Sequence, residues 1–564
     1  MTAAERRIFW SVAIVSAVAR FASRARSLWE WDEALFCLGM RSYDVTQHHP
    51  HPPGFPAYIA LGRIVRLFVH DDFRSLQSIN LVAGMLLFPA VFLFARAIGV
   101  RFSTSVIAGA ICAFLPNVWF YGGTAFSDVP SITLAVFAAA LIIRGERNGE
   151  SYLAGVLLMA IAIGIRPQNA LIGLFPLLYA TRRRSRRDIA FAALIGIAIV
   201  GSAFFGAAAA TGSFDAYRDA VRTHSEYITQ VDSFHNPLRP PLWRLVALFF
   251  GKIYGAPALD ITLTILVIVS LIAAMRSRDR PMLYNALTFG PVAIASWLFL
   301  DRYSATRFAI GYIPMFAIFA ADGITRIARQ RSRIEAVLAV ALVIVFAAFA
   351  LPAFTSVRRD VAPTILAVDA ASTHFNASTQ DLYVASDMSP FVDYFAPALH
   401  YTRVIDERAV PIVATGKEPE LVAEVIATEP AGYVFRRERG NLWNISRRHY
   451  FGAGYFPVRR SAEFLSGWYP GERSRDSEWR WMAARSTMLL PPSAGETLLR
   501  LDLTADSPTP VTLMRNAVKL DTFTVDGDVR RQWHIDDANA PTRLVMITNR
   551  DHAIRLRALS WAPY

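Results

Sequence analysis

The feature that most constrains this chain is a series of long apolar stretches, free of charge, in its first 355 residues. About eleven of them are long enough to cross a bilayer as helices, several near the lower length limit. They begin near Ile8, Ile79, Phe102, Val129, Tyr152, Pro167, Ile189, Ala258, Met282, Phe308 and Ala336. Only 18% of the residues are charged and 54% are hydrophobic, whereas a soluble protein keeps more charge on its surface. The sequence therefore predicts a multi-spanning α-helical membrane protein.

Arginine clusters between these stretches indicate the side on which each loop lies. Six clusters fall on one side if the spans alternate, and the positive-inside rule makes that side the cytoplasm, with a cytoplasmic N-terminus. They are Arg6/Arg7, Arg96/Arg101, Arg144/Arg147, the run 182–187, Arg276/Arg278/Arg280 and Arg326/Arg329/Arg331/Arg333. The outer side then receives residues 22–78, 121–128, the junction at Arg166, 211–257, 301–307 and the chain after Phe354. We expect the chemistry on that outer side.

The net charge of +13 does not indicate a nucleic-acid partner. The chain from Ser356 onward is close to neutral, so the excess lies among the apolar stretches, as the positive-inside rule requires. Two cysteines in 564 residues exclude a disulfide framework. Phosphate-binding loops of the P-loop and dinucleotide types are not found in the sequence, so nucleotide-driven chemistry is unsupported.

Two outer segments are predicted to lie as helices in the membrane interface. Residues 56–68 place apolar side chains at helical spacing with Arg63 and Arg66 on the other face, and the segment from Trp243 to Tyr254 is similar. After residue 355 the composition becomes that of a soluble protein. Residues 356–460 predict a small α/β unit, and residues 461–564 predict short alternating strands of a β-sandwich.

Several outer-side side chains are candidates for chemistry. In Trp29-Glu-Trp-Asp-Glu33, Asp32 and Glu33 are adjacent carboxylates that are either functional or simply solvated beside interfacial tryptophans. In His48-His-Pro-His-Pro-Pro-Gly54, prolines hinder convergence on one ion, so a turn with one functional histidine is favoured over a metal site. Asp128, with Pro130 two residues later, fits a helix N-cap, and capping does not exclude a catalytic role.

Arginines on the outer side break the positive-inside trend. Arg302 and Arg307, in the segment Asp301–Arg307, either pair with acids or bind an anionic group such as a phosphate. Arg166 lies between two spans and presents the same two alternatives.

The order of these motifs resembles that of the GT-C glycosyltransferase superfamily. WDEALF, HPPG, GGTAFSDVP, RPQ and RFAIGYIPMFAIFAADG follow one another in residues 1–355, and are most similar to bacterial protein O-mannosyltransferase-like and aminoarabinose-transferase-like members. The resemblance implies a GT-C-like catalytic domain over residues 1–355 in the bacterial inner membrane. It implies transfer of a sugar from a polyprenyl-phosphate carrier to a glycan, lipid or protein acceptor at the periplasmic face, usually with inversion.

The resemblance also suggests roles for the candidate residues. Asp32 would be the general base, with Glu33 and Asp128 the other members of the catalytic set. Positive charge for the leaving phosphate would come from Arg302 and Arg307, with Arg166 a weaker third. The remaining residues expected to bind substrate are His51, which would orient donor or acceptor, and His224 or His235, which would close over the site.

The resemblance further implies no metal and no other cofactor, because the two acids are adjacent instead of forming a D-x-D motif. Residues 461–564 resemble carbohydrate-binding β-sandwiches, in which Trp468, Trp479 and Trp481 either stack on sugars or belong to the core. Two other functions stay open: a transporter or flippase of lipid-linked sugars, and a non-catalytic glycan-binding membrane protein. Charges gathered in outer loops, instead of deep in the spans, favour the enzyme.

Overall fold

The computed structural model describes most of the membrane-type half of the chain and separate stretches of the rest. The described residues are 1–233, 241–251, 257–299, 307–359, 361–362, 364–365, 368–369, 372, 380–385, 389–404, 412–416, 422–425, 427–428, 434–435, 458–461, 463–473, 478–490, 497–536 and 542–563. They divide into two compact units, one up to Ala362 and one from Thr364 onward. The predicted boundaries at 355 and 460 stay predictions.

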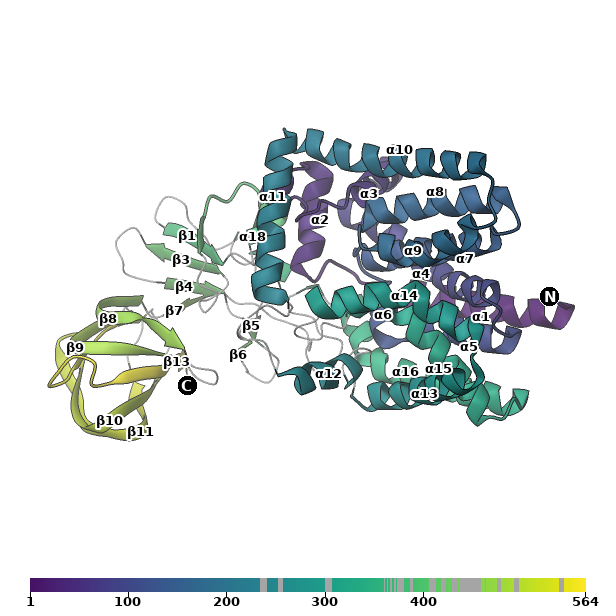
Figure 1. Ribbon diagram of the computed structural model, residues 1–564. Helices are drawn as coiled ribbons and strands as arrows, with labels where there is room; N and C mark the ends of the chain where they lie inside the picture. The colour runs from purple at the N-terminus through teal and green to yellow at the C-terminus, as the bar shows by residue number, and fades with distance from the viewer. Residues whose placement is uncertain are drawn as a thin grey trace. The chain divides into compact units, whose positions relative to one another are not determined.

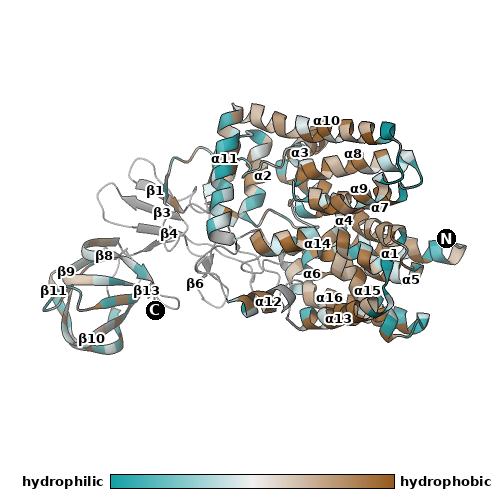
Figure 2. Ribbon diagram, in the orientation of Figure 1, coloured by the Kyte–Doolittle hydropathy of each residue, from teal (hydrophilic) through white to brown (hydrophobic). Residues whose placement is uncertain are grey.

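A helix lies at each of the eleven positions where the sequence predicts a span (Figure 1). These helices are α1 (Ala3–Ala22), α4 (Asp72–Ala97), α5 (Phe102–Phe114), α7 (Asp128–Arg144), α8 (Gly149–Ile165), α9 (Asn169–Thr181), α10 (Arg186–Ala210), α13 (Pro257–Ser277), α14 (Arg280–Phe299), α15 (Ile313–Ile327) and α16 (Ser332–Arg359). The predicted α-helical class is confirmed. Figure 2 shows that most of them are hydrophobic along much of their length.

Length separates these helices into groups. Five are long and apolar enough to cross a membrane on their own, namely α4, α10, α13, α14 and α16, and α5, α8 and α9 are shorter apolar helices. Helix α5 has 13 residues, or about 20 Å, which is less than the thickness of a hydrocarbon core. It ends where Pro116 begins the short helix α6 (Pro116–Tyr121), since proline cannot donate the next helical hydrogen bond. The number of eleven spans stays a prediction.

The break between α5 and α6 is held by Arg20 of α1. This side chain is buried, and its Nη2 and Nη1 donate hydrogen bonds to the carbonyl oxygens of Ala113, at 2.6 Å, and Val118, at 2.9 Å. It also lies against Gly84 and Gly122, where a Cβ atom would come within about 3 Å of its atoms. Arg20 thus supplies donors to backbone acceptors on both sides of the break, of which the Val118 carbonyl also accepts from the Gly122 amide.

The loops predicted to be cytoplasmic meet one another in pairs. The side chain of Arg101, before α5, lies 2.8 Å from Glu335 in α16, and that of Arg326, in α15, lies 2.8 Å from Asp279 before α14. Arg184, before α10, donates a hydrogen bond of 2.7 Å to the carbonyl oxygen of Glu146, before α8. These contacts agree with the predicted common side of the basic clusters.

The other end of the bundle carries short elements built from the outer segments. They are α2 (Trp31–Arg41), the 3-10 turn η1 (Val45–Gln47), α3 (Pro56–Val69), α11 (Phe214–Tyr227), the π-type turn η2 (Ile228–Asp232), α12 (Leu242–Gly251) and the 3-10 turn η3 (Phe308–Gly311). Helix α3 exposes Ile64, Leu67 and Phe68, and α12 exposes Leu242 and Trp243. Both predicted interfacial segments are helices, and their place in an interface stays a prediction. Helix α11 is mainly polar (Figure 2).

The second unit begins with a mixed sheet. Its strands are ordered β2-β1-β3-β4-β7, with β1 (Gln380–Ala385), β2 (Thr402–Val404), β3 (Ile412–Gly416), β4 (Val422–Val425) and β7 (Val458–Ser461). Strands β1 and β2 are parallel and joined through α18 (Ser389–Phe395), as the strand–helix–strand pattern predicts. A separate pair is formed by β5 (Ala427–Thr428) and β6 (Val434–Phe435).

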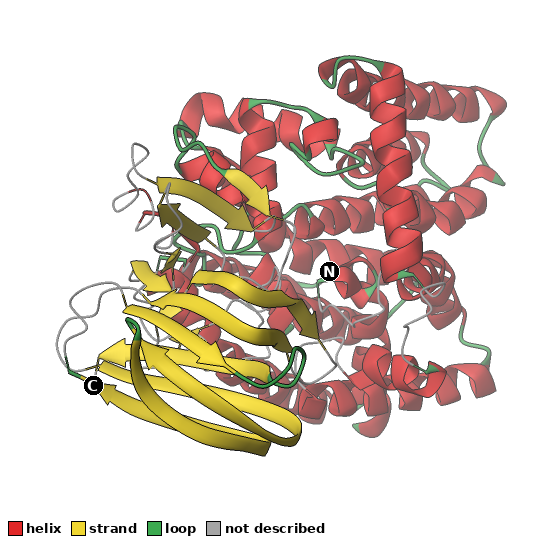
Figure 3. Cartoon of the chain, turned by 90° about the vertical axis from the view of Figure 1, so that its left-hand side faces the viewer, coloured by secondary structure: helices red, strands yellow, loops and turns green. Residues whose placement is uncertain are grey.

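The described strands from Glu463 onward form the predicted all-β part, shown as the large yellow sheet in Figure 3. Its antiparallel strands are β8 (Glu463–Arg473), β9 (Glu478–Leu490), β10 (Thr497–Arg515), β11 (Val518–Ile535), β12 (Thr542–Ile547) and β13 (Arg555–Pro563). The first half of β10 pairs with β13 and its last residues pair with β12, on either side of a register shift between Ala505 and Thr509. Long strands that change partners at such shifts form the corners of a two-layered β structure.

The three tryptophans considered above differ in their contact with the core of this β part. It is formed by alternating inward side chains such as Leu499, Leu501 and Leu503. Trp468 packs against this core, whereas Trp479 and Trp481 are not among the residues packed on it. The core interpretation therefore holds for Trp468.

Candidate active site

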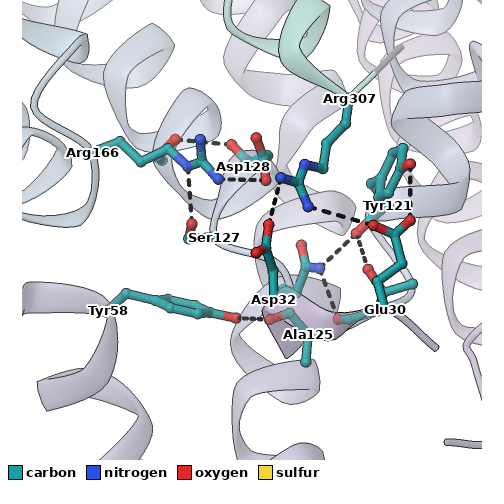
Figure 4. A network of polar contacts seen from close by, with 12 residues as sticks. Glu30, Asp32, Tyr58, Tyr121, Ala125, Ser127, Asp128, Arg166 and Arg307 are labelled. Carbon is teal, nitrogen blue, oxygen red and sulfur yellow. Dashed lines mark hydrogen bonds and ion pairs between the residues drawn. The ribbon is translucent and has the colours of Figure 1, made fainter. Parts of the chain in front are cut away.

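Side chains from several of the segments assigned to the outer side form one polar network (Figure 4). Asp32 lies on α2, Asp128 lies in the first turn of α7, and Arg166 lies at the junction of α8 and α9. Arg307 directly precedes η3. Four separate segments thus converge. Convergence was not visible in any one motif, but it follows from the predicted sidedness, because all four segments were assigned to the same side.

Glu33 fixes the start of α2. One of its carboxylate oxygens accepts hydrogen bonds from the backbone amides of Trp29 (2.7 Å) and Glu30 (3.0 Å), and the other accepts from Ala125, before α7 (2.8 Å). Its residue is 0% exposed. Burial raises the pKa of Glu33 to about 7, although the backbone hydrogen bonds act in the opposite direction. Both oxygens hold backbone in place, and a catalytic role for Glu33 stays a prediction.

Asp32 and Arg307 form the centre of the site. Asp32 Oδ2 lies 2.5 Å from Arg307 Nη2, and the two side chains are 17% and 14% exposed. Burial alone would raise the pKa of Asp32, but the charge and hydrogen bond of Arg307, together with the charges of His51 and Arg166, outweigh it and lower that pKa to about 2. The pKa of Arg307 is raised because nearby carboxylates outweigh the effect of its burial. Its guanidinium also lies over the ring of Phe126, 4.5 Å from the centroid.

Glu30 is a site residue that the sequence reasoning missed. Its side chain is 4% exposed, its Oε2 lies 3.5 Å from Arg307 Nη1, and its Oε1 accepts a hydrogen bond of 3.2 Å from the Tyr121 hydroxyl. Burial raises the pKa of Glu30 to about 8, more than Arg307 lowers it. The sequence signal for this role of Glu30 is its position two residues before Asp32. Glu30 precedes α2 and Asp32 lies in its first turn, so both side chains can reach one cation.

Asp128 and Arg166 form a second buried pair. Arg166 Nη2 lies 2.7 Å from Asp128 Oδ2, and Arg166 Nε donates a hydrogen bond of 2.9 Å to Ser127 Oγ. The N-cap of α7 is Ser127, so the N-cap alternative for Asp128 is wrong. The acid-pair alternative for Arg166 is confirmed.

The histidine motif lies beside Asp32. His51 Nδ1 is 3.7 Å from Asp32 Oδ1, and the His51 ring packs on Phe55 with centroids 4.8 Å apart. Burial lowers the pKa of His51 to about 4, although Asp32 acts in the opposite direction. Helix α11 brings His224 beside His51, and their ring centroids lie 6.0 Å apart. Tyr217 anchors α11 there, because its hydroxyl donates a hydrogen bond of 2.8 Å to the Pro53 carbonyl oxygen.

Two further residues predicted for the site, Arg302 and His235, lie outside the described residues. Among the described residues, groups of three or more histidine, cysteine, aspartate or glutamate side chains with a metal-binding arrangement are not found. Metal dependence stays a prediction. What the arrangement offers chemically is a carboxylate, Asp32, next to a cation that can accept an anionic group, with a second arginine held nearby.

No protein-family model matches the sequence, and no curated protein matches it. Among solved structures, the chain is similar to ArnT from Cupriavidus metallidurans bound to undecaprenyl phosphate. Sequence identity is 14%, the TM-score is 0.47, and 72% of this chain and 87% of that chain are covered. It is also similar to the oligosaccharyltransferase AglB from Archaeoglobus fulgidus in complex with an inhibitory peptide and a dolichol-phosphate. There the identity is 10%, the TM-score 0.45, and the coverage 100% and 97%.

A third similar structure is the protein O-mannosyltransferase Pmt1-Pmt2 complex of S. cerevisiae bound to the sugar donor. Identity is 16%, the TM-score is 0.29, and 40% of this chain and 34% of that chain are covered. The identities and TM-scores are low, so the function of this chain is argued from its own residues.

Proposed function

We propose that this chain is a membrane glycosyltransferase that moves a sugar from a polyprenyl-phosphate carrier to an acceptor hydroxyl, with inversion. The observation that carries the proposal is the buried contact between Asp32 and Arg307 at the end of the bundle where the outer segments converge. A base and a phosphate-binding cation must lie on either side of one anomeric carbon in this reaction, because the bond formed and the bond broken share that carbon.

In the proposed reaction, Asp32 takes the proton of the acceptor hydroxyl as its oxygen attacks the anomeric carbon. The bond from that carbon to the carrier's phosphate oxygen breaks, and the polyprenyl phosphate leaves with the electron pair. Attack from the face opposite the phosphate inverts the configuration at this carbon. Asp32 is suited to the task because its carboxylate is ionised at neutral pH and is 17% exposed.

Arg307 stabilises the charge that develops on the leaving phosphate. Its planar guanidinium can hold two phosphate oxygens at once, and its burial strengthens the attraction. Arg166 is the second cation of the site, although Asp128 and Ser127 already hold two of its three nitrogens. We propose that Asp128 keeps Arg166 in place, and that His51 and His224 contact donor or acceptor.

The proposal includes the placement of the protein in the bacterial inner membrane. The carrier's polyprenyl tail reaches the site from the lipid, and the exposed apolar side chains of α3 and α12 lie on the elements that flank that route. The basic loops face the cytoplasm, and the site and the second unit face the periplasm.

The test is a transfer assay on the full chain in lipid nanodiscs. A panel of radiolabelled polyprenyl-phosphate sugars is supplied with cell-envelope extract as acceptor, and release of polyprenyl phosphate is measured. We expect Asp32→Asn to lower the rate by about 10²- to 10⁴-fold, the usual contribution of a general base, with donor binding retained.

The matched control is Asp215→Asn, an exposed aspartate on α11 whose side chain is 77% exposed. It should leave the rate unchanged. A flippase would instead move a fluorescent lipid-linked sugar across vesicles without cleaving it, and Asp32→Asn would not affect that movement. Movement without cleavage by the wild type would refute the proposal.

A further inference from the structure

One guanidinium serves two carboxyl groups in this site. Arg307 contacts Asp32 through Nη2 at 2.5 Å and Glu30 through Nη1 at 3.5 Å. Its flat face rests on the ring of Phe126. The contact with Asp32 is the shorter one, and it involves the carboxylate that has to accept a proton in the proposed reaction.

In this arrangement the contact with Arg307 conflicts with two needs of the proposed reaction: a basic Asp32 and an arginine that can bind the donor's phosphate. A carboxylate in close contact with an arginine is a weak base, since the cation stabilises its ionised form. The same arginine has to reach the donor's phosphate, which competes with Asp32 for its N–H groups. Both requirements are met if the phosphate takes the place of Asp32 on Arg307, because Asp32 then becomes a stronger base only when donor is present.

We propose that Arg307 holds Asp32 inactive until the donor's phosphate draws the Nη2 end of the guanidinium away, and that Glu30 is the positioning residue that retains the Nη1 end. This inference rests on the proposed function and adds the order of events at the same site. It assigns to Glu30 a role that its place in the sequence motif did not indicate.

Glu30 is placed to retain the guanidinium without competing strongly for it. Its carboxyl is fixed by the Tyr121 hydroxyl, and it approaches Arg307 at the nitrogen that does not contact Asp32. The charges of the site indicate a protonated Glu30. Arg166 and Arg307 balance Asp128 and Asp32, so ionised Glu30 would add an uncompensated buried charge. A neutral Glu30 carboxyl orients the guanidinium of Arg307, and the donor's phosphate still attracts that guanidinium more strongly.

The exchange makes phosphate binding depend on pH. Once Arg307 leaves Asp32, burial raises the pKa of Asp32 and the carboxylate takes up a proton at mildly acidic pH. By linkage, phosphate binding must then tighten as the pH falls. The other titratable or charged groups around Asp32 are His51 on the α2–α3 loop, His224 on α11, Glu30 and Glu33 at α2, Tyr121 on α6, Asp128 on α7, and Arg166 and Arg307.

The experiment measures binding without turnover. The probe is the methyl ester of undecaprenyl phosphate, a phosphodiester that lacks the second phosphate pKa near 6. Its affinity for the full chain in nanodiscs is measured by calorimetry at pH 7 and pH 4.5. For the wild type we expect affinity to rise about tenfold at the lower pH, with proton uptake, which corresponds to a pKa of Asp32 in the bound state about one unit above the lower pH.

Three variants separate Asp32 and Glu30 from their neighbours. Asp32→Asn should bind the probe about tenfold more tightly than wild type at pH 7, and with little further gain at pH 4.5, although His51, His224 and Glu33 still titrate. Glu30→Ala should bind about tenfold more weakly at both pH values. Glu30→Gln keeps the shape and the acceptor for Tyr121, so it should stay within threefold of wild type at pH 7. The matched control is Glu150→Gln, an exposed glutamate in the first turn of α8.

The outcomes separate this inference from the proposed function. A wild type that transfers sugar but binds the probe with equal affinity at both pH values overturns the exchange and leaves the proposed function standing. The same pH dependence in Asp32→Asn assigns it to other groups and also overturns the exchange. Unchanged binding by Glu30→Ala removes the role of Glu30. A wild type that neither transfers sugar nor binds the probe overturns both proposals.

Discussion

The buried pair of Asp128 and Arg166 should contribute strongly to the stability of the site, and a double-mutant cycle can measure it. The variants are Asp128→Ala, Arg166→Met and the double variant. The side chains are 6% and 11% exposed and 2.7 Å apart, so either single change leaves a charge buried without its partner. Such changes cost about 3–5 kcal/mol. Ser127 still accepts a hydrogen bond from Arg166, so we place Asp128→Ala near 3 kcal/mol.

The double variant removes both charges, and its cost is that of lost packing alone. We therefore expect it to be destabilised by less than the sum of the two single variants, with a coupling of at least about 2 kcal/mol. A loss of about 3 kcal/mol corresponds to a fall in melting temperature of roughly 5 °C for a unit of this size.

The assay is thermal unfolding of the full chain in detergent, followed with a dye that becomes fluorescent on reacting with thiols. Cys37 and Cys112 are both buried, so they react only when the helical unit opens. The matched control is the exposed pair of Arg222 and Asp219, 3.5 Å apart on α11, whose cycle should give a coupling below about 0.5 kcal/mol. Additive effects at Asp128 and Arg166, within about 0.5 kcal/mol, would refute the reasoning.

Three further predictions follow from single residues. Glu33→Gln keeps only one acceptor oxygen for three backbone amides, so we expect about 2 kcal/mol of destabilisation and a loss of transfer activity, measured by the thiol assay and by polyprenyl phosphate release. His51 stays neutral when folded because burial lowers its pKa from 6.5 to about 4, so the unfolded chain binds the extra proton and stability falls between pH 6.5 and 4. His51→Gln should lose less stability over that range than wild type, and an equal loss would contradict this account. Ala517 lies at φ +70° in the two-residue turn that it forms with Asn516, and Ala517→Gly should stabilise the β part by about 1 kcal/mol, measured as slower proteolysis of that part.

The sequence predicts the helical unit well because a bilayer allows few alternatives. Each apolar stretch has to become a helix there, so the starts near Ile79, Ile189 and Met282 correspond to α4, α10 and α14. Arginine placement assigned the segments around Asp32, Asp128 and Arg307 to one side, and these residues meet there. What periodicity could not supply was α2, because Trp31–Arg41 has a short apolar face within a loop of mixed composition.

Contacts between distant segments explain most of what the sequence left open. The role of Glu33 depends on the Ala125 amide, which is 92 residues away, and that of Glu30 depends on Tyr121 and Arg307. In the β part, the runs from Thr497 and from Pro510 are interrupted by the Ser507-Pro-Thr-Pro510 segment and suggest two strands. They are one strand, β10, because its two halves pair with different neighbours across a register shift.

The buried Arg20 has a consequence for the biosynthesis of the chain. Its two carbonyl partners lie 93 and 98 residues later in the sequence, so they have not been translated when α1 enters the membrane. Until α5 and α6 arrive, this charge must be solvated by water or lipid headgroups, which holds the outer end of α1 at the bilayer surface. The final position of the first helix therefore depends on the synthesis of the segment that ends at Tyr121, because that segment supplies the backbone acceptors of Arg20.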